Sequence, residues 1–312
     1  MILVCFLIII ILLVFLCINR QYYIKNRVKN SLNTELYNPT LEELQTEKII
    51  WSYWNSKERP LSVNLAIHTW KKHNPDFLIC VLSENTVSDY LDLNTFPKKY
   101  SKLNHQHKAD IIRLALLEKY GGYWLDSTLY LNQPLSILWE PKDYEIGGYY
   151  ADFFTKDKKN PVLENWFLSA PKNSKLVKEW KSEFYKGIDY DNPSDYINEL
   201  EKEVDLQNIK DKTYLMMHCA FLKIIKDQKD QTNQKDQTNQ NYRLKVLPAG
   251  AKGGPFEYLV KFKFNDLLYV IYILTSKGED VLPVIKLRGG ERKIIEWCWF
   301  MLLKNSIIDK LV

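Results

Sequence analysis

The feature that most constrains this chain is a helix pattern, a double glycine and a strand pattern in direct succession, within residues 106–131. Apolar residues from Ala109 to Tyr120 recur at helical spacing, and no Pro or Gly interrupts them. Gly121 and Gly122 then end the helix, because glycine readily takes the left-handed conformation that closes a helix C-terminus. A helix, a glycine turn and a strand are therefore expected in this order.

The stretch after the glycines has the composition of a strand, with aromatic, β-branched and aliphatic residues over 123–131. Alternate residues of a strand share a face. Asp126 and Thr128 are therefore expected to point the same way, with Leu125 and Leu129 on the opposite side. A carboxylate and a hydroxyl that leave a strand end together are typical of a functional site.

The preceding region predicts a parallel sheet. Residues 49–54 have a strand pattern, 61–72 a helix pattern and 77–82 a second strand pattern. Strand, helix and strand in this order form a βαβ unit. Sites in such sheets lie at the carboxyl ends of the strands, and Trp54 and Asp126 both fall there.

The C-terminal half continues the α/β pattern. Strands are expected at 144–150, 242–247 and 281–287, and amphipathic helices at 176–184 and 214–226.

Three further segments have unusual compositions. Residues 226–241 hold two copies of Lys-Asp-Gln-Thr-Asn-Gln and no apolar side chain to bury, so a flexible surface loop is expected. The segments 262–274 and 294–303 are strongly apolar. We expect them to form C-terminal core, and a surface resting on a bilayer is the alternative.

The N-terminus predicts a membrane anchor. Residues 2–18 contain neither a charge nor a Pro, and as a helix they would span about 26 Å, enough to cross a thin bilayer. A cleaved signal peptide is less consistent, because a basic start and a small-residue cleavage site are missing. The sequence thus divides into a transmembrane helix (1–18), a polar stem (19–47) and a main domain (48–312).

The charge pattern and the cysteine content indicate where the main domain is located and which partners are excluded. Four basic residues between 20 and 29 follow the anchor. By the positive-inside rule, this places the main domain in the cytoplasm. A placement in the Golgi lumen stays open if the protein is a eukaryotic secretory protein. Outside the anchor, Cys80, Cys219 and Cys298 are an odd number and widely spaced, which argues against a disulfide framework. The 43 basic and 38 acidic residues are dispersed, which argues against nucleic-acid binding.

The ordered motifs resemble the DXD-containing sugar transferases, in particular the capsular polysaccharide synthesis group related to initiating mannosyltransferases. The similarity covers roughly residues 48–135. The motif residues that carry it are Asp110 and Arg113, Gly121 and Gly122, and Asp126 and Thr128. The resemblance implies a GT-A-like α/β nucleotide-sugar-binding fold with a central, mostly parallel sheet. It also implies an anomer-retaining hexosyltransferase that moves a sugar from a nucleotide-sugar donor to a polysaccharide, glycan or glycolipid acceptor.

The resemblance also implies roles for individual residues. Asp126 and Arg113 are the expected catalytic residues. The expected donor-binding residues are Trp54, Asp110, Arg113, Gly121, Gly122, Asp126 and Lys286. Trp54 would stack on the donor base and Lys286 would face the diphosphate. Structural alternatives remain for several of them: a local ion pair for Asp110 and Arg113, a core side chain for Trp54 and a solvated strand position for Lys286.

A divalent metal, Mn²⁺ or Mg²⁺, is the expected cofactor, because transfer from a nucleotide sugar requires neutralisation of a diphosphate leaving group. The predicted ligands are Asp126, Thr128 and His218. Thr128 is a weaker ligand than the Asp of the two-carboxylate motif. His218 lies in an apolar helix pattern, where a core histidine is the alternative.

Two other functions stay open at this point. One is a non-catalytic, membrane-bound carbohydrate-binding protein, and the other is a nucleotide-dependent phosphotransferase on the same type of sheet. The sequence contains no Walker A motif, no G-x-G-x-x-G pattern, no zinc-type Cys/His spacing and no nucleophilic Ser elbow.

Overall fold

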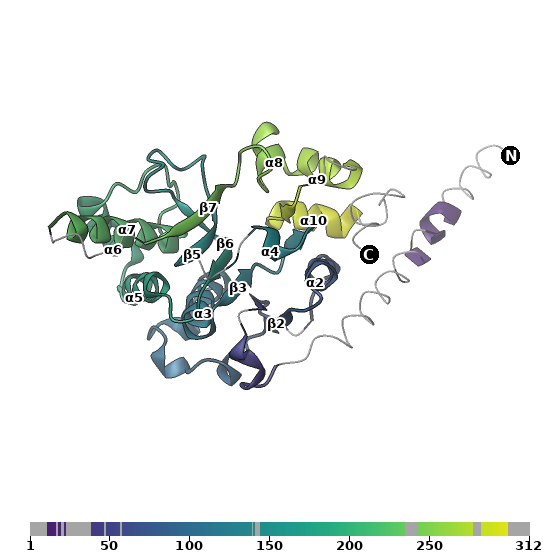
Figure 1. Ribbon diagram of the computed structural model, residues 1–312. Coiled ribbons are helices and arrows are strands. Elements are labelled where there is room, and N and C mark those ends of the chain that lie inside the picture. Colours follow the sequence, from purple (N-terminus) through teal and green to yellow (C-terminus); the bar gives the residue numbers. More distant parts are fainter. Residues whose placement is uncertain are drawn as a thin grey trace.

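The computed structural model describes most of the chain after residue 38. The described residues are 39–46, 48–56, 58–138, 140, 144–234, 242–276 and 282–298, with 11–16, 18, 19 and 22 near the N-terminus. Within them, six strands form one sheet and two form a smaller one. Helices lie on both faces of the large sheet (Figure 1).

The large sheet is mixed, with the strand order β2-β1-β3-β6-β5-β7. Its strands are β1 (Ile49–Tyr53), β2 (Leu78–Leu82), β3 (Gly122–Leu125), β5 (Ile146–Tyr150), β6 (Leu163–Ala170) and β7 (Leu244–Pro248). β2, β1 and β3 are parallel, β6 is antiparallel to both β3 and β5, and β5 is parallel to β7. Five of the six strands thus run in one direction and β6 alone opposes them, so the predicted mostly parallel sheet is corrected to a mixed sheet with one antiparallel strand. The chain passes from β5 to β6 without the crossover helix that a parallel pair requires.

The helices alternate with these strands in the first half and cluster in the second. They are α2 (Leu61–His73), α3 (His105–Tyr120), α4 (Leu135–Leu138), α5 (Lys175–Asp189), α6 (Pro193–Glu203), α7 (Met216–Gln234), α8 (Glu257–Lys261), α9 (Asp266–Thr275) and α10 (Gly289–Cys298), with 3-10 turns at Glu43–Gln45, Val87–Asp89, Leu93–Thr95 and Tyr100–Lys102. The predicted βαβ unit is confirmed as β1, α2 and β2, and the predicted motif helix is confirmed as α3.

Two hydrophobic cores lie on opposite faces of the sheet. All five residues of β1 are buried, and alternate side chains enter different cores. Trp51 packs in the core shared with α3, α5 and α7, whereas Ile50 packs in the core shared with α2 and α9. Figure 1 shows α3 and α5 on one side of the central strands and α2 on the other.

The strand predicted over 123–131 is interrupted. β3 ends at Leu125, and β4 (Leu129–Leu131) pairs antiparallel with β8 (Val284–Lys286) in the second sheet. The intervening turn is closed by a 2.9 Å hydrogen bond from the Leu129 N–H to the Asp126 carbonyl. The sequence hides this break because the residues on both sides are apolar and buried. Asp126 and Thr128 therefore lie in a turn between two sheets and not on one strand.

The predicted transmembrane helix over 1–18, and with it the single-pass membrane localisation, is contradicted. No helix among the described residues is long and apolar enough to cross a bilayer. Residues 1–10 and 17 of the predicted segment lie outside the described residues.

The predicted stem and loop also change at their edges. Leu44, within the predicted stem, is buried in the core, so the folded domain begins before residue 48. The predicted loop 226–241 is helical as far as Gln234, and 235–241 lie outside the described residues. Once α7 has started in the core, each added Lys, Gln or Asp costs little, because helix elongation is far easier than nucleation.

The apolar segment 262–274, predicted to form C-terminal core, is only partly buried. α9 buries Tyr269 and Val270, while Leu267 and Leu268 are exposed.

Gly121 holds the junction between α3 and β3. Its φ of +70° ends α3, and its N–H donates to the Leu117 carbonyl at 3.0 Å. An added Cβ would lie 2.5 Å from the Lys172 backbone nitrogen. Trp51 Nε1 also donates to the Gly121 carbonyl at 3.0 Å. The glycine is therefore required both by conformation and by close backbone approach.

Gly121→Ala is expected to lower the free energy of unfolding by more than about 2 kcal/mol, since it combines an unfavourable φ with a backbone clash. Gly253→Ala is the matched control: φ is +82° there, but nothing lies within 4 Å of an added Cβ. That variant should lose only about 1 kcal/mol. Urea unfolding measures both, and equal losses would show that the contact with Lys172 is unimportant.

Candidate functional site

A cavity of about 750 Å³ opens beside the turn that follows β3. Its lining includes Trp54 after β1, Asp110 and Arg113 from α3, Asp126 after β3, Glu164 from β6, His218 from α7 and Lys286 from β8. Segments far apart in the sequence thus meet at one edge of the sheet, as expected for a site at the carboxyl ends of β1 and β3.

Asp126 presents its carboxylate to this cavity. Its backbone N–H donates to the Trp166 carbonyl at 2.9 Å, which ties the turn to β6. Oδ1 accepts from Arg113 Nη2 at 2.9 Å and from Trp124 Nε1 at 3.0 Å. Oδ2 accepts from Lys286 Nζ at 2.7 Å. Both carboxylate oxygens are therefore engaged by protein donors.

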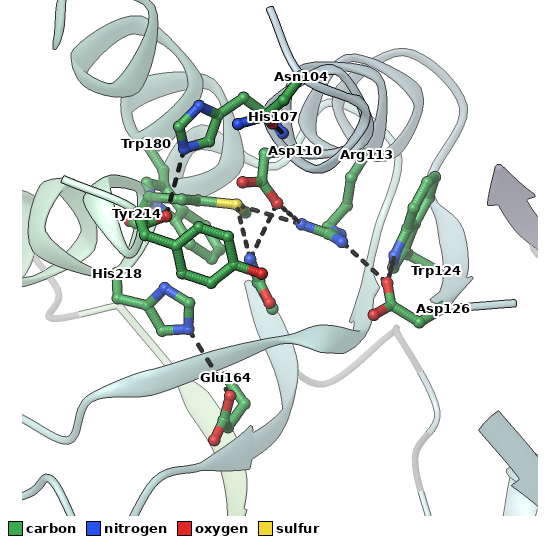
Figure 2. Close-up of polar contacts among 12 residues, drawn as sticks. Asn104, His107, Asp110, Arg113, Trp124, Asp126, Glu164, Trp180, Tyr214 and His218 are labelled. Carbon is green, nitrogen blue, oxygen red and sulfur yellow. Dashed lines mark hydrogen bonds and ion pairs between the residues drawn. The ribbon is translucent and has the colours of Figure 1, made fainter. Parts of the chain in front are cut away.

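Arg113 lies between two carboxylates, as Figure 2 shows. Its Nη1 donates to Asp110, three residues earlier on α3, and its Nη2 donates to Asp126. The guanidinium also lies 4.7 Å from the ring centroid of Trp124, a cation–π contact. The Arg113 side chain is 3% exposed and that of Asp126 is 27% exposed. Asp126 thus faces the cavity, with Arg113 behind it.

The environment shifts the pKa values of the two carboxyl groups in opposite directions. Burial raises the pKa of Asp126, but the positive charges of Lys286 and Arg113 outweigh burial, and the net pKa lies below its ordinary value. For Asp110, burial is the larger effect and raises the pKa in spite of Arg113. Asp126 is therefore held ionised within the cavity.

Of the remaining residues that the sequence predicted for the site, some line the cavity and others do not. Trp54 lines the cavity, and the Arg292 guanidinium lies 5.2 Å from its ring centroid. Thr128 lines it too, and its Oγ1 donates to the Leu287 carbonyl at 2.8 Å. Gly121 and Gly122 do not, because they lie at the start of β3 and Asp126 follows its end. Their place in the fold is structural.

His218 lines the same cavity without joining the predicted metal ligands. Its Nε2 lies 3.6 Å from Glu164 Oε2, and its Nδ1 is buried with no hydrogen-bond partner among the described residues. Figure 2 shows the pair on the side of Asp110 away from Asp126.

The described side chains do not fit a divalent cation in this arrangement. Mg²⁺ and Mn²⁺ require several oxygen ligands. Here Asp126 is already paired with two cations, Thr128 donates to a carbonyl, and His218 pairs with Glu164. Among the described residues, no three His, Cys, Asp or Glu side chains gather where they could hold an ion. The metal requirement stays a prediction.

Several cavity residues were missed by sequence reasoning. Asn165 Nδ2 donates to Asp110 Oδ1 at 2.9 Å, and Glu164 precedes it on β6. Nothing in their local pattern marks them, since they reach the cavity only because β6 pairs with β3. Trp124 could have been found, because it lies two residues before Asp126.

Comparison with known proteins identifies relatives of this chain. The model of the family described as "Capsular polysaccharide synthesis protein" matches residues 17–251. The chain is 27% identical over 167 residues to the O-glycosyltransferase braB of Annulohypoxylon truncatum, which covers 47% of this chain and 39% of that protein. It is 24% identical over 158 residues to the O-glycosyltransferase PaGT of Phomopsis amygdali, with 45% and 38% covered. The matched part thus spans less than half the length of these relatives.

Two solved structures show weak similarity to this chain. The glycosyltransferase GlyE of Streptococcus pneumoniae TIGR4 has a TM-score of 0.40 at 13% identity, with 85% of this chain and 63% of that chain covered. The PaToxG glycosyltransferase has a TM-score of 0.36 at 13% identity, with 69% and 83% covered. At these scores the structural likeness adds no argument about the site.

Arg113→Met should lower the free energy of unfolding by about 3–5 kcal/mol at neutral pH, because it leaves two carboxylates without their shared buried cation. A low folded-state pKa stabilises the fold above the unfolded pKa and ceases to do so as the pH falls through the folded value. The part of the difference that comes from Asp126 should therefore shrink as the pH falls below the ordinary carboxyl value of 3.8 and through the lower folded-state value.

Urea unfolding at several pH values measures this effect. Arg113→Lys is the control, since it keeps the charge and should lose less stability. If both variants lose the same free energy of unfolding at every pH, the effect comes from the packing of Arg113 on Trp124 alone.

Proposed function

The chain belongs to the capsular polysaccharide synthesis protein family, and we therefore propose that it is a glycosyltransferase that moves a sugar from a nucleotide-sugar donor to a glycan or lipid-linked acceptor. The names of its relatives support this activity. The observation that carries the proposal is the convergence of Arg113 and Lys286 on Asp126 inside one cavity.

The cavity suits such a donor in size and charge. Ligand sites commonly measure about 300–1,000 Å³, so 750 Å³ has room for a nucleotide and a hexose. Arg and Lys are the side chains that bind phosphate best. Asp126, held ionised between them, keeps both cations in position and offers oxygens to sugar hydroxyls.

The reaction in this proposal breaks the bond between the anomeric carbon and the diphosphate oxygen. The electron pair leaves with the nucleoside diphosphate, and the acceptor oxygen forms the new bond. Arg113 and Lys286 stabilise the charge that develops on the leaving group, and one such preplaced donor contributes about 3–4 kcal/mol to barrier lowering. Trp54 provides a ring face for the donor base, and Arg292 lies over that ring at 5.2 Å.

Assay of products separates this function from its alternatives. A panel of nucleotide sugars, screened first by thermal shift, should give release of nucleoside diphosphate and a glycosylated acceptor. Binding without turnover would identify a carbohydrate-binding protein. A phosphorylated product would identify a phosphotransferase.

Asp126→Asn is expected to lower turnover at least about 100-fold, because shape is kept while the charge that positions both cations is lost. Asp76→Asn makes the same chemical change at the exposed Lys48–Asp76 ion pair and should leave turnover unchanged. Steady-state kinetics on both variants, with melting curves to confirm folding, provide the measurement. Retention of more than about a tenth of the wild-type kcat would remove Asp126 from the mechanism.

We also propose that the anomeric configuration is retained, as the family resemblance implies. An inverting enzyme requires a general base on the acceptor side. Among the described cavity carboxylates, Glu164 is the one without a Lys or Arg ion pair, so it is the candidate for such a base.

Glu164→Gln should keep kcat within about tenfold of wild type if the configuration is retained, because no base contributes. Proton NMR of the product reports the anomer directly. An inverted product together with a loss of about 100-fold or more in the variant would overturn retention.

A further inference from the structure

Lys286 occupies the position that the sequence predicted for a metal. Its Nζ donates to Asp126 Oδ2 at 2.7 Å and lies 3.2 Å from Thr128 Oγ1. These two oxygens are the ones that the Asp-x-Thr motif was expected to offer to a divalent cation. One ammonium group therefore bridges both of them.

The bridge is held by backbone structure. Lys286 is opposite Leu129 in the β4–β8 pair. The Leu287 N–H donates to the Thr128 carbonyl at 3.1 Å, and Thr128 Oγ1 donates to the Leu287 carbonyl at 2.8 Å. The turn and the lysine strand thus form one unit, and the Lys286 side chain is buried. The second sheet therefore positions this cation.

The other basic side chains that line the cavity have different partners. Arg288 pairs with Asp266 and Glu291, and Arg292 lies over Trp54. Arg113 takes the remaining oxygen of Asp126. The carboxylate thus carries two protein cations, and a divalent ion would have to approach two positive charges to reach a single carboxylate.

We propose that the Lys286 ammonium replaces the divalent cation in this site, so that sugar transfer requires no metal. Lys286 neutralises Asp126 in the free protein and donates to the diphosphate when the donor is bound. The anomeric C–O bond breaks, its electron pair goes to the diphosphate oxygen that Lys286 and Arg113 stabilise, and the acceptor hydroxyl proton is transferred to the departing diphosphate. No further co-reactant is needed. This inference rests on the proposed glycosyltransferase function.

The first test uses the wild-type full chain with the panel of UDP- and GDP-sugars, in excess EDTA and in excess Mn²⁺. Nucleoside diphosphate release is expected to agree within about threefold between the two buffers, because the lysine provides the charge that a metal would supply. Turnover that EDTA abolishes and Mn²⁺ restores would overturn the inference while leaving the glycosyltransferase function intact.

The second test removes the ammonium. Lys286→Met should lose at least about 100-fold in EDTA, and Mn²⁺ should restore part of the activity, because Asp126 Oδ2 and Thr128 Oγ1 become free to bind it. Lys286→Arg keeps a cation and should retain more metal-independent turnover than Lys286→Met. A purely structural role for Lys286 predicts equal loss in both variants and no rescue by Mn²⁺.

A Mn²⁺-binding measurement tests the inference without relying on enzyme activity. Titration of Mn²⁺ followed by calorimetry should show no site in wild type, a site in Lys286→Met, and no site in the double variant with Asp126→Asn. A wild-type site that Asp126→Asn removes would overturn the inference. Absence of turnover with every donor in both buffers would instead count against the proposed function, and the titration would still decide the role of Lys286.

Discussion

The ion network around Arg113 is the interaction on which the cavity depends. A guanidinium that is 3% exposed needs anionic partners, because an unpaired buried charge is strongly destabilising. Asp110 supplies one from the same helix and Asp126 supplies the other from the turn after β3. The network therefore sets where α3 lies against the sheet. It also holds Asp126 at the cavity wall as an ionised carboxylate.

The second sheet, formed by β4 and β8, brings the second cation to Asp126. β4 continues the chain directly from the Asp126 turn, and β8 brings Lys286 back from more than 150 residues away. Two short strands are a weak structure alone, but here they pack into the core with α2 and α9. The result is a carboxylate held between two cations that come from different parts of the fold.

Local reasoning predicted the elements whose signals lie close together in the chain. The helical spacing before Tyr120 and the glycine after it correctly predicted α3 and its end. The same reasoning failed at Asp126, where buried apolar residues on both sides concealed a turn. It also failed for the repeat after residue 226, because a helix that starts in a packed core extends further than its composition predicts.

The sequence alone determined the βαβ start of the sheet, the glycine junction, and the placement of Asp110 and Arg113 on one helix face. These depend on spacings of a few residues, which backbone geometry translates directly into position. Only the tertiary structure decided that β6 runs antiparallel, that Glu164 and Asn165 enter the cavity, and that Lys286 reaches Asp126. Such contacts depend on strand pairing between distant segments, and the energy of pairing resides in backbone hydrogen bonds and shared burial that no local pattern records.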